Sequence, residues 1–371
     1  MKSKFATLII IIFMFLTIIA MIILGYKRLE KLKEIAGNID IAGVNTVISN
    51  QEKSTQEEMQ TPNIVEGNGF DSIERTNNGD YSNVNVDGYL YEQINKYSKI
   101  IYKALEANKE NMKTGTYTIE LGDSFSEVLE ETNGQEKLSQ YYQSAIEAYI
   151  YDNPDIFYLD PNKMYMNIET TTKGNKKTYN VYINNGNDAN YLIDEFSSKE
   201  QINEAINQME NVKNQILSNK TGDAYKDIKM LHDYLVDNVQ YDETISKPNI
   251  YNAYGALVNK VAVCEGYARS FKYLLDNLGI PCVLVTGKGE NDSGKMENHA
   301  WNYVSLDNKW YAVDVTWDDP IVIGGGTSSQ SSRYKYFLKG SSEFNVNHYP
   351  SNQFTQDGME FTFPELRSIN Y

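Results

Sequence analysis

The segment VAVCEGYARSFKYLLDNLGIPCVLVTG, from Val261 to Gly287, decides the fold of the C-terminal half of this chain. Apolar residues recur at helical spacing after Cys264, and Gly279 followed by Pro281 marks where such a helix ends. Cys282 then opens the strand CVLVT. The segment therefore predicts a helix that begins at Cys264 and a strand that follows it.

A cysteine at the start of a helix is well placed for nucleophilic chemistry. The unpaired N–H groups and the positive end of the helix dipole point toward its sulfur and favour the thiolate. The competing interpretation is that Cys264 is a small buried apolar residue, as free cysteines often are. Only Cys282 accompanies it, and a helix between the two would separate them by roughly 20 Å. Both are therefore expected to be free thiols.

A second segment, NHAWNYVSLDNKWYAVDVTWDDP from Asn298 to Pro320, reads as two strands joined by a tight turn at Asp307-Asn308. Such a turn places residue 301 opposite 314 and residue 299 opposite 316. His299 and Asp314 then become diagonal neighbours on one face, about 7–8 Å apart at the backbone. A slip of one residue would put them on opposite faces.

Together the two segments predict a catalytic triad. Cys264 would attack a carbonyl carbon, His299 would accept and return the proton, and Asp314 would orient the imidazole and stabilise its cation. Cysteine, histidine and aspartate also bind zinc, but a structural zinc site needs four ligands with paired spacing, and neither CxxC nor HxxxH occurs here. No metal is expected. His232, beside the apolar stripe of a helix expected at residues 224–239, is interpreted as a buried core residue.

The order of these motifs resembles that of bacterial transglutaminase-like proteins. The resemblance covers best the span from Ala224 to Asp319, and more weakly the tail YKYFLKGSSEFNVNHYP at residues 334–350. It implies a Cys-His-Asp triad on a papain-like α+β scaffold, with helices packed on an antiparallel sheet. The stretch YIYDNPDIFYLD, at residues 149–160, looks like the region that precedes this domain in some such proteins.

Two departures limit what the resemblance implies. The animal crosslinking enzymes have a tryptophan after the nucleophile, whereas Glu265 and Gly266 follow Cys264 here, and no acidic calcium loop is evident. We therefore expect no calcium and no other cofactor. The attack would place negative charge on the carbonyl oxygen, and the second hydrogen-bond donor to this oxyanion is not identified. The candidates are the backbone N–H groups at the helix start and the side chains of Tyr254 and Trp301. The three tryptophans are interpreted chiefly as core and pocket walls; they are Trp301, Trp310 and Trp317.

The whole chain divides by composition into four segments. Phe5 to Leu24 is an apolar run of about 30 Å as a helix, which predicts a retained transmembrane anchor, with a cleaved signal peptide as the alternative. The flanking lysines favour an intracellular catalytic domain, but the resemblance to surface-acting proteins favours an extracellular one, which we expect. The predicted domains are residues 1–34, the anchor; 35–88, a flexible polar linker; 89–196, a small accessory α/β domain; and 197–371, the catalytic domain.

Local patterns outline the accessory domain and its junction with the catalytic one. Apolar residues at positions 90–105 predict a helix, those at 117–121 a strand, and 137–151 a second helix. Residues 164–171 and 177–183 predict a hairpin, and Ser197 with Glu200 predicts a capping box at the next helix.

The net charge of −16 repels phosphate backbones, so nucleic-acid partners are not expected. The expected partners are a protein or peptide substrate and a membrane; the oligomeric state stays open.

The triad favours acyl transfer from a glutamine or peptide carbonyl to an amine. One alternative is a surface cysteine peptidase or amidase, because a triad alone does not select between an amine and water as acceptor. The other is a catalytically silent binding protein, because a fold does not fix function.

Overall fold

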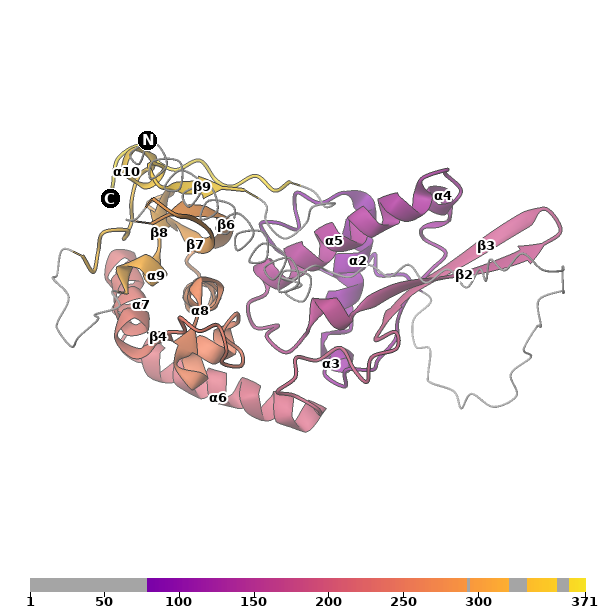
Figure 1. Cartoon of the computed structure of the whole chain (residues 1–371), viewed down its shortest axis with the longest axis horizontal. Coiled ribbons are helices and arrows are strands. Elements are labelled where there is room, and N and C mark those ends of the chain that lie inside the picture. Colours follow the sequence, from indigo (N-terminus) through magenta and orange to yellow (C-terminus); the bar gives the residue numbers. More distant parts are fainter. Residues whose placement is uncertain (1–78, 292–293, 320–331, 352–359) are drawn as a thin grey trace, which may run out of the picture. The chain divides into compact units, whose positions relative to one another are not determined.

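The computed structural model describes residues 79–291, 294–319, 332–351 and 360–371, which fall within one compact unit (Figure 1). The expected anchor at Phe5–Leu24 lies outside the described residues. Within the described ranges, no helix combines the length and the apolar character needed to cross a membrane.

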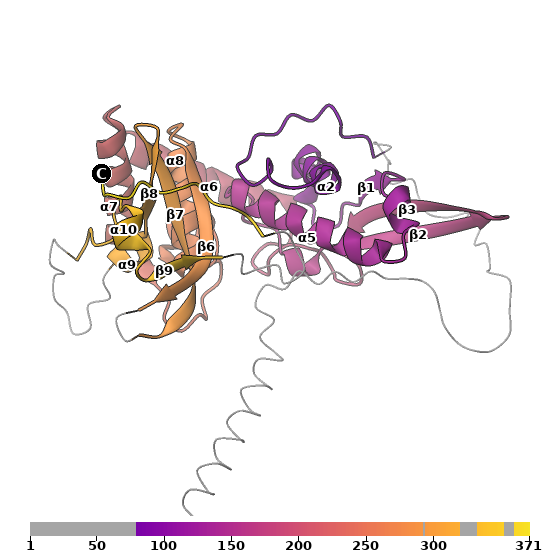
Figure 2. The same ribbon diagram turned by 90° about the horizontal axis from the view of Figure 1, so that it is seen from above.

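The N-terminal part of the described chain combines helices with a small antiparallel sheet of strand order β1-β3-β2. Its elements are α2 (Lys96–Ala107), α3 (Lys109–Met112), β1 (Ile119–Gly122), α4 (Ser126–Leu129), α5 (Gly134–Asp152), the 3-10 turn η1 (Pro161–Lys163), β2 (Tyr165–Lys173) and β3 (Lys176–Asn184). The expected hairpin is confirmed: Lys173 pairs with Lys176, and Gly174 takes the positive φ that the turn requires. Figure 2 shows β2 and β3 as a long two-stranded ribbon.

Two local expectations for this part need correction. Helix α2 starts later than its apolar spacing predicts, because the Asn95 side chain accepts hydrogen bonds from the N–H groups of Tyr97 and Ser98 and so caps the helix there. Packing also reaches into the segment assigned to the linker. Tyr81 is buried, and its hydroxyl donates to the carbonyl of Glu120. An aromatic side chain that is buried in this way fixes the backbone around it.

The C-terminal part contains the four-stranded antiparallel sheet β8-β7-β6-β9, as the sequence predicts for an α+β domain. Its helices and strands are α6 (Lys199–Leu217), α7 (Ala224–Asn238), β4 (Gln240–Tyr241), the π-helical turn η2 (Gly255–Asn259), β5 (Val261–Ala262), α8 (Cys264–Asp276), β6 (Cys282–Glu290), β7 (Met296–Leu306), β8 (Lys309–Val313), α9 (Val315–Asp318), α10 (Ser341–Phe344) and β9 (His348–Pro350). Helix α8 packs against β6 and β7 (Figure 1).

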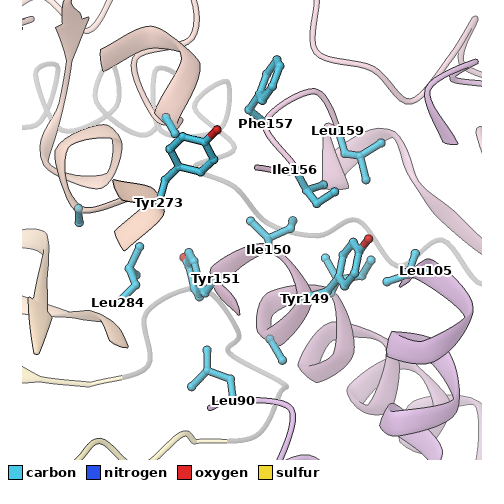
Figure 3. Packing of buried hydrophobic residues seen from close by; sticks show 14 of the residues in the cluster. Leu90, Leu105, Tyr149, Ile150, Tyr151, Ile156, Phe157, Leu159, Tyr273 and Leu284 are labelled. Carbon is cyan, nitrogen blue, oxygen red and sulfur yellow. The ribbon is translucent and has the colours of Figure 1, made fainter. Parts of the chain in front are cut away.

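Alternation along β7 explains how the sheet is covered on both faces. Ala300 and Val304 belong to the main core cluster, and between them Asn302 donates from its side chain to the Ala268 carbonyl of α8. The alternate residues Trp301 and Tyr303 belong to a second, smaller cluster. The main cluster also includes residues of α5, α8 and β6, among them Tyr151, Tyr273 and Leu284 (Figure 3).

The capping box before α6 was predicted one residue too early. The N-cap is Ser198, whose hydroxyl accepts from the N–H of Gln201, while the Gln201 side chain accepts from the N–H of Ser197. Neighbouring serines make the two positions hard to separate in the sequence. The next helix, α7, has the expected extent to within one residue.

Candidate active site

Cys264 is the first residue of α8, as expected. Val263 before it is extended and offers no side-chain cap, so the first N–H groups of the helix are not satisfied by an N-cap side chain. Both cysteines are free; Cys264 is partly exposed and Cys282 is buried. Burial raises the pKa of the Cys282 thiol far above its ordinary range. The two thiols therefore occupy contrasting environments.

Gly266 allows the start of α8 to pack closely against the preceding loop. A Cβ atom at this position would lie 2.3 Å from the carbonyl oxygen of Ile250 and 2.8 Å from the Cβ atom of Ala262. No side chain larger than hydrogen fits there without a backbone shift. The residue two positions after the nucleophile candidate thus helps to fix where the helix begins.

The hairpin that carries His299 has the predicted register. Asp307 and Asn308 both have positive φ, as a type I′ turn requires, and Asn302 pairs with Val313. The second strand is shorter than predicted, however. It ends at Val313, and Asp314 becomes the N-cap of the short helix α9. This bend replaces the expected diagonal cross-strand contact with a direct hydrogen bond of 2.7 Å between His299 Nε2 and Asp314 Oδ2.

The Asp314 carboxylate is fully buried and accepts four hydrogen bonds. Oδ1 accepts from the backbone N–H groups of Thr316 and Trp317, at 3.0 and 3.2 Å. Oδ2 lies 2.7 Å from His299 Nε2 and 3.1 Å from His348 Nε2. Burial alone would raise the pKa of Asp314, but the charge and hydrogen bond of His299 outweigh it and hold the pKa well below its ordinary value. The carboxylate is therefore ionised and fixed in orientation.

His299 is buried against the indole ring of Trp317, with 4.6 Å between the ring centroids and 23° between the planes. Burial lowers the pKa of the imidazole, but the charge of Asp314, its hydrogen bond and a hydrogen bond with the Cys264 thiol raise it to about 10. Because Nε2 is committed to Asp314, Nδ1 is left for the thiol. The structure thus brings Cys264, His299 and Asp314 together; their catalytic roles stay predictions.

Two tyrosines that interact electrostatically with Cys264 were not predicted. Tyr241 and Tyr251 both interact electrostatically with Cys264. Strand β4 explains the position of Tyr241, which pairs with Ala262 two residues before the cysteine. Burial, followed by the nearby Cys264 charge, raises the pKa of Tyr241 well above its ordinary value, so its hydroxyl stays protonated. The parallel β4–β5 pair is too short to read from sequence periodicity.

The two side chains considered as oxyanion donors, those of Tyr254 and Trp301, make contacts with other residues instead. The Tyr254 hydroxyl donates to Gln208 Oε1 at 2.9 Å, and its ring stacks on Phe157. Trp301 is 1% exposed, and its ring packs against Phe344 and His348 in the second core cluster. Trp301 is thus a core residue, as interpreted, and Trp317 forms a wall against His299.

His232 is a buried residue with partners at both ring nitrogens, as interpreted from its place on α7. Its Nε2 lies 3.1 Å from Asp318 Oδ2, and its Nδ1 lies 3.1 Å from Asp233 Oδ1. The other oxygen of Asp318 accepts from the N–H of Tyr336. The histidine therefore anchors the end of α9, the helix that Asp314 caps at its start.

The sequence spacing gave no sign of a metal-capable cluster, but the fold assembles one. Ligand atoms of His299, Asp314 and His348 lie within 4.8 Å of one another, although 15 and 34 positions separate the histidines from Asp314 in the sequence. The contacts of Asp314 Oδ2 with both imidazoles are at hydrogen-bonding distances.

Comparisons with known proteins find similarity over the region that carries this site. Residues 210–315 match the family model of the transglutaminase-like superfamily. The chain is 28% identical over 156 residues to Kyphoscoliosis peptidase of Mus musculus and 26% identical over 155 residues to that of Homo sapiens. Each match covers 38% of this chain and 23% of the relative, so the chain spans about a quarter of their length.

A crystal structure of a TGase aligns at 16% identity over 47% of this chain and 50% of that one, with a TM-score of 0.29. The family match includes Cys264, His299 and Asp314 within its bounds. Residues 210–315 are thus similar to the domain that defines the transglutaminase-like superfamily.

Proposed function

We propose that this protein is a thiol-dependent acyl-transfer enzyme that acts on protein or peptide amides. The observation that supports it most is the buried His299–Asp314 pair, hydrogen-bonded at 2.7 Å, beside a partly exposed cysteine at the start of a helix. Each group has the environment that its role requires: an accessible nucleophile, a base whose cation is stabilised, and an ionised carboxylate that orients it.

In the proposed reaction, the Cys264 proton already resides on His299, whose raised pKa favours the imidazolium, and the Cys264 thiolate attacks the amide carbonyl carbon. The tetrahedral intermediate collapses as His299 gives that proton to the leaving nitrogen, which releases ammonia or an amine and leaves a thioester on Cys264. His299 then takes a proton from the acceptor, an amine or water, which attacks the thioester and expels the thiolate. Asp314 keeps the imidazole oriented in both halves of the cycle.

The developing oxyanion needs hydrogen-bond donors close to the nucleophile. The backbone N–H groups at the start of α8 are suited to this role because no N-cap side chain binds them. We propose the Tyr241 hydroxyl as the second donor, because it is protonated and because Tyr241 pairs with Ala262, two residues before Cys264. It takes the place of Tyr254 and Trp301 among the candidates.

Transfer to an amine, as in a transglutaminase, is the first candidate reaction, and hydrolysis is the second. The similarity to two proteins named Kyphoscoliosis peptidase favours hydrolysis. We further propose that the chain is anchored in a membrane through Phe5–Leu24 with its catalytic domain outside the cell, and that it needs no cofactor.

Intact-mass analysis of the full chain with glutamine-containing peptides, with and without an added primary amine, tests the proposal. Transfer predicts an amine adduct on the peptide and loss of ammonia; hydrolysis predicts deamidation or cleavage whether or not the amine is present. Cys264→Ala should abolish either product, and Cys282→Ala should retain it. Products that persist in Cys264→Ala would refute the proposed nucleophile, and an unchanged peptide pool would favour a binding protein.

A further inference from the structure

A second histidine contacts the carboxylate of the proposed triad. His348 opens β9, an edge strand that pairs with β6, and the pairing of His348 with Gly289 carries its ring into the interior. It is fully buried, and its Nε2 lies 3.1 Å from the same Asp314 oxygen that faces His299. A polar ring buried beside a catalytic carboxylate calls for a physical reason.

We propose that His348 is a positioning residue that holds Asp314 Oδ2 in the direction of His299. The inference rests on the proposed function, since it assigns a role within the same triad. Two backbone N–H groups hold the other oxygen, Oδ1. With His348 in place, both oxygens are braced and the carboxylate has no freedom to turn about its Cβ–Cγ bond.

The two histidines on Asp314 differ in their charge. His299 has its pKa raised by the neighbouring carboxylate, whereas burial and the charge of His299 lower the pKa of His348. A neutral His348 donates through Nε2–H without adding a second positive charge. Its Nδ1, 2.9 Å from the Asn347 amide, then accepts from the NH2 group of that amide, with the amide oxygen turned toward the Tyr336 hydroxyl. A cation there would compete with the His299 imidazolium for Asp314, so neutrality suits a group that orients the carboxylate.

Packing is the alternative reason for a ring at this position. The His348 ring stacks on Phe344 with 3.8 Å between centroids and lies 4.6 Å from Trp317 and 5.0 Å from Trp301. If this aromatic cluster were the whole reason, a phenylalanine would replace the histidine well. If the hydrogen bond matters, a side chain with an N–H donor at the same reach would replace it better.

His348→Phe and His348→Gln separate the two roles, because phenylalanine keeps the ring and the glutamine amide reaches the position of Nε2 with a donor. The readout is the rate of iodoacetamide alkylation of Cys264 in the full chain between pH 6 and 9, located by peptide mass and accompanied by thermal melting. We expect His348→Phe to slow alkylation at pH 6 about tenfold or more and His348→Gln to stay within about threefold of wild type. The reverse order would overturn the proposal.

His232 offers a matched control. It is as buried as His348, contacts the aromatic ring of Phe337 and hydrogen-bonds Asp318 at the other end of α9. His232→Phe should lower the melting temperature and leave Cys264 alkylation within about threefold of wild type. An equal loss of alkylation in His232→Phe and His348→Phe would show a general packing effect and overturn the positioning role.

A measurement on the unaltered chain covers the case in which a variant does not fold. Histidine-selective 15N NMR at pH 7 should show His348 neutral with its proton on Nε2. A proton on Nδ1 alone, or a cationic ring, would overturn the proposal. If wild-type Cys264 reacts no faster than an ordinary thiol, the proposed function fails and the inference with it; if wild type is fast and His348→Phe equals it, only the inference fails.

Discussion

Asp314→Asn is the substitution whose effect the structure defines most fully. The amide keeps the size of the side chain, but it cannot accept at all four positions. If its oxygen stays with the N–H groups of Thr316 and Trp317, its NH2 group faces Nε2 of both His299 and His348, where donor meets donor. If the amide turns over, its NH2 group faces the backbone N–H groups of Thr316 and Trp317, and donor again meets donor.

The electrostatic loss is larger than the steric one. The pKa of His299 is about 10, against an ordinary value of 6.5. The difference of about 3.5 corresponds to roughly 5 kcal/mol in favour of the imidazolium. Without Asp314, only Cys264 is left to oppose burial, which is the largest single influence on this pKa. We therefore expect the pKa of His299 to fall below 6.5 and acyl transfer to fall by about a thousandfold or more.

Histidine-selective 15N NMR measures this directly, because the chain has only three histidines to assign. His299 should titrate near pH 10 in the wild type and below 6.5 in Asp314→Asn. In the folded state His299 keeps a proton that the unfolded chain releases near pH 6.5. Its stabilisation is therefore complete below pH 6.5 and is lost as the pH rises through about 10.

The melting temperature of the wild type should therefore decrease as the pH rises from 6.5 to about 10. The melting temperature of Asp314→Asn should lack this decrease. A variant in which His299 still titrates above about pH 9 would refute the reasoning, since another group would then have to stabilise the cation.

Two further substitutions follow from the structure, and one fractionation experiment follows from the sequence. Gly266→Ala should destabilise the fold by about 1–3 kcal/mol in chemical denaturation, because its Cβ atom would lie 2.3 Å from the Ile250 carbonyl oxygen; wild-type stability would contradict that close packing. Tyr241→Phe should keep the fold and lower acyl transfer at least about tenfold through loss of an oxyanion donor, and unchanged turnover would remove Tyr241 from that role. The full chain should sediment with membranes through Phe5–Leu24, whereas full-length protein in the soluble fraction would argue against a retained anchor.

Local signals predicted the parts of the site that are close together in sequence. The turn residues Asp307 and Asn308 set the register of the hairpin, and the apolar spacing after Cys264 set the start of α8. Both depend on backbone conformations that individual residues favour, so they can be read from one sequence. Gly279, with its positive φ after α8, belongs to the same class.

Asp314 shows where a periodic pattern misleads. The residues around it alternate like a strand, yet its side chain caps a helix by accepting from the N–H groups of Thr316 and Trp317. Alternation and capping compete at this position, and the buried carboxylate decides the outcome. The result strengthens the contact with His299, from a diagonal pair to a direct hydrogen bond.

His348 and Tyr241 could not be placed from the sequence at all. His348 reaches Asp314 because β9 pairs with β6 across a long connection, and a two-residue strand pair places Tyr241 opposite Ala262, two residues before Cys264. Pairings of this kind depend on the tertiary fold and leave no periodic signal.

The reactivity of Cys264 tests the central claim most directly, because it needs no substrate. The full chain is treated with iodoacetamide at pH 6, where an ordinary thiol is almost entirely protonated, and both cysteines are followed by peptide mass. We predict that Cys264 is labelled orders of magnitude faster than the buried Cys282 and that His299→Ala removes most of this advantage. Equally slow labelling of both cysteines, or a Cys264 rate unchanged in His299→Ala, would contradict the account.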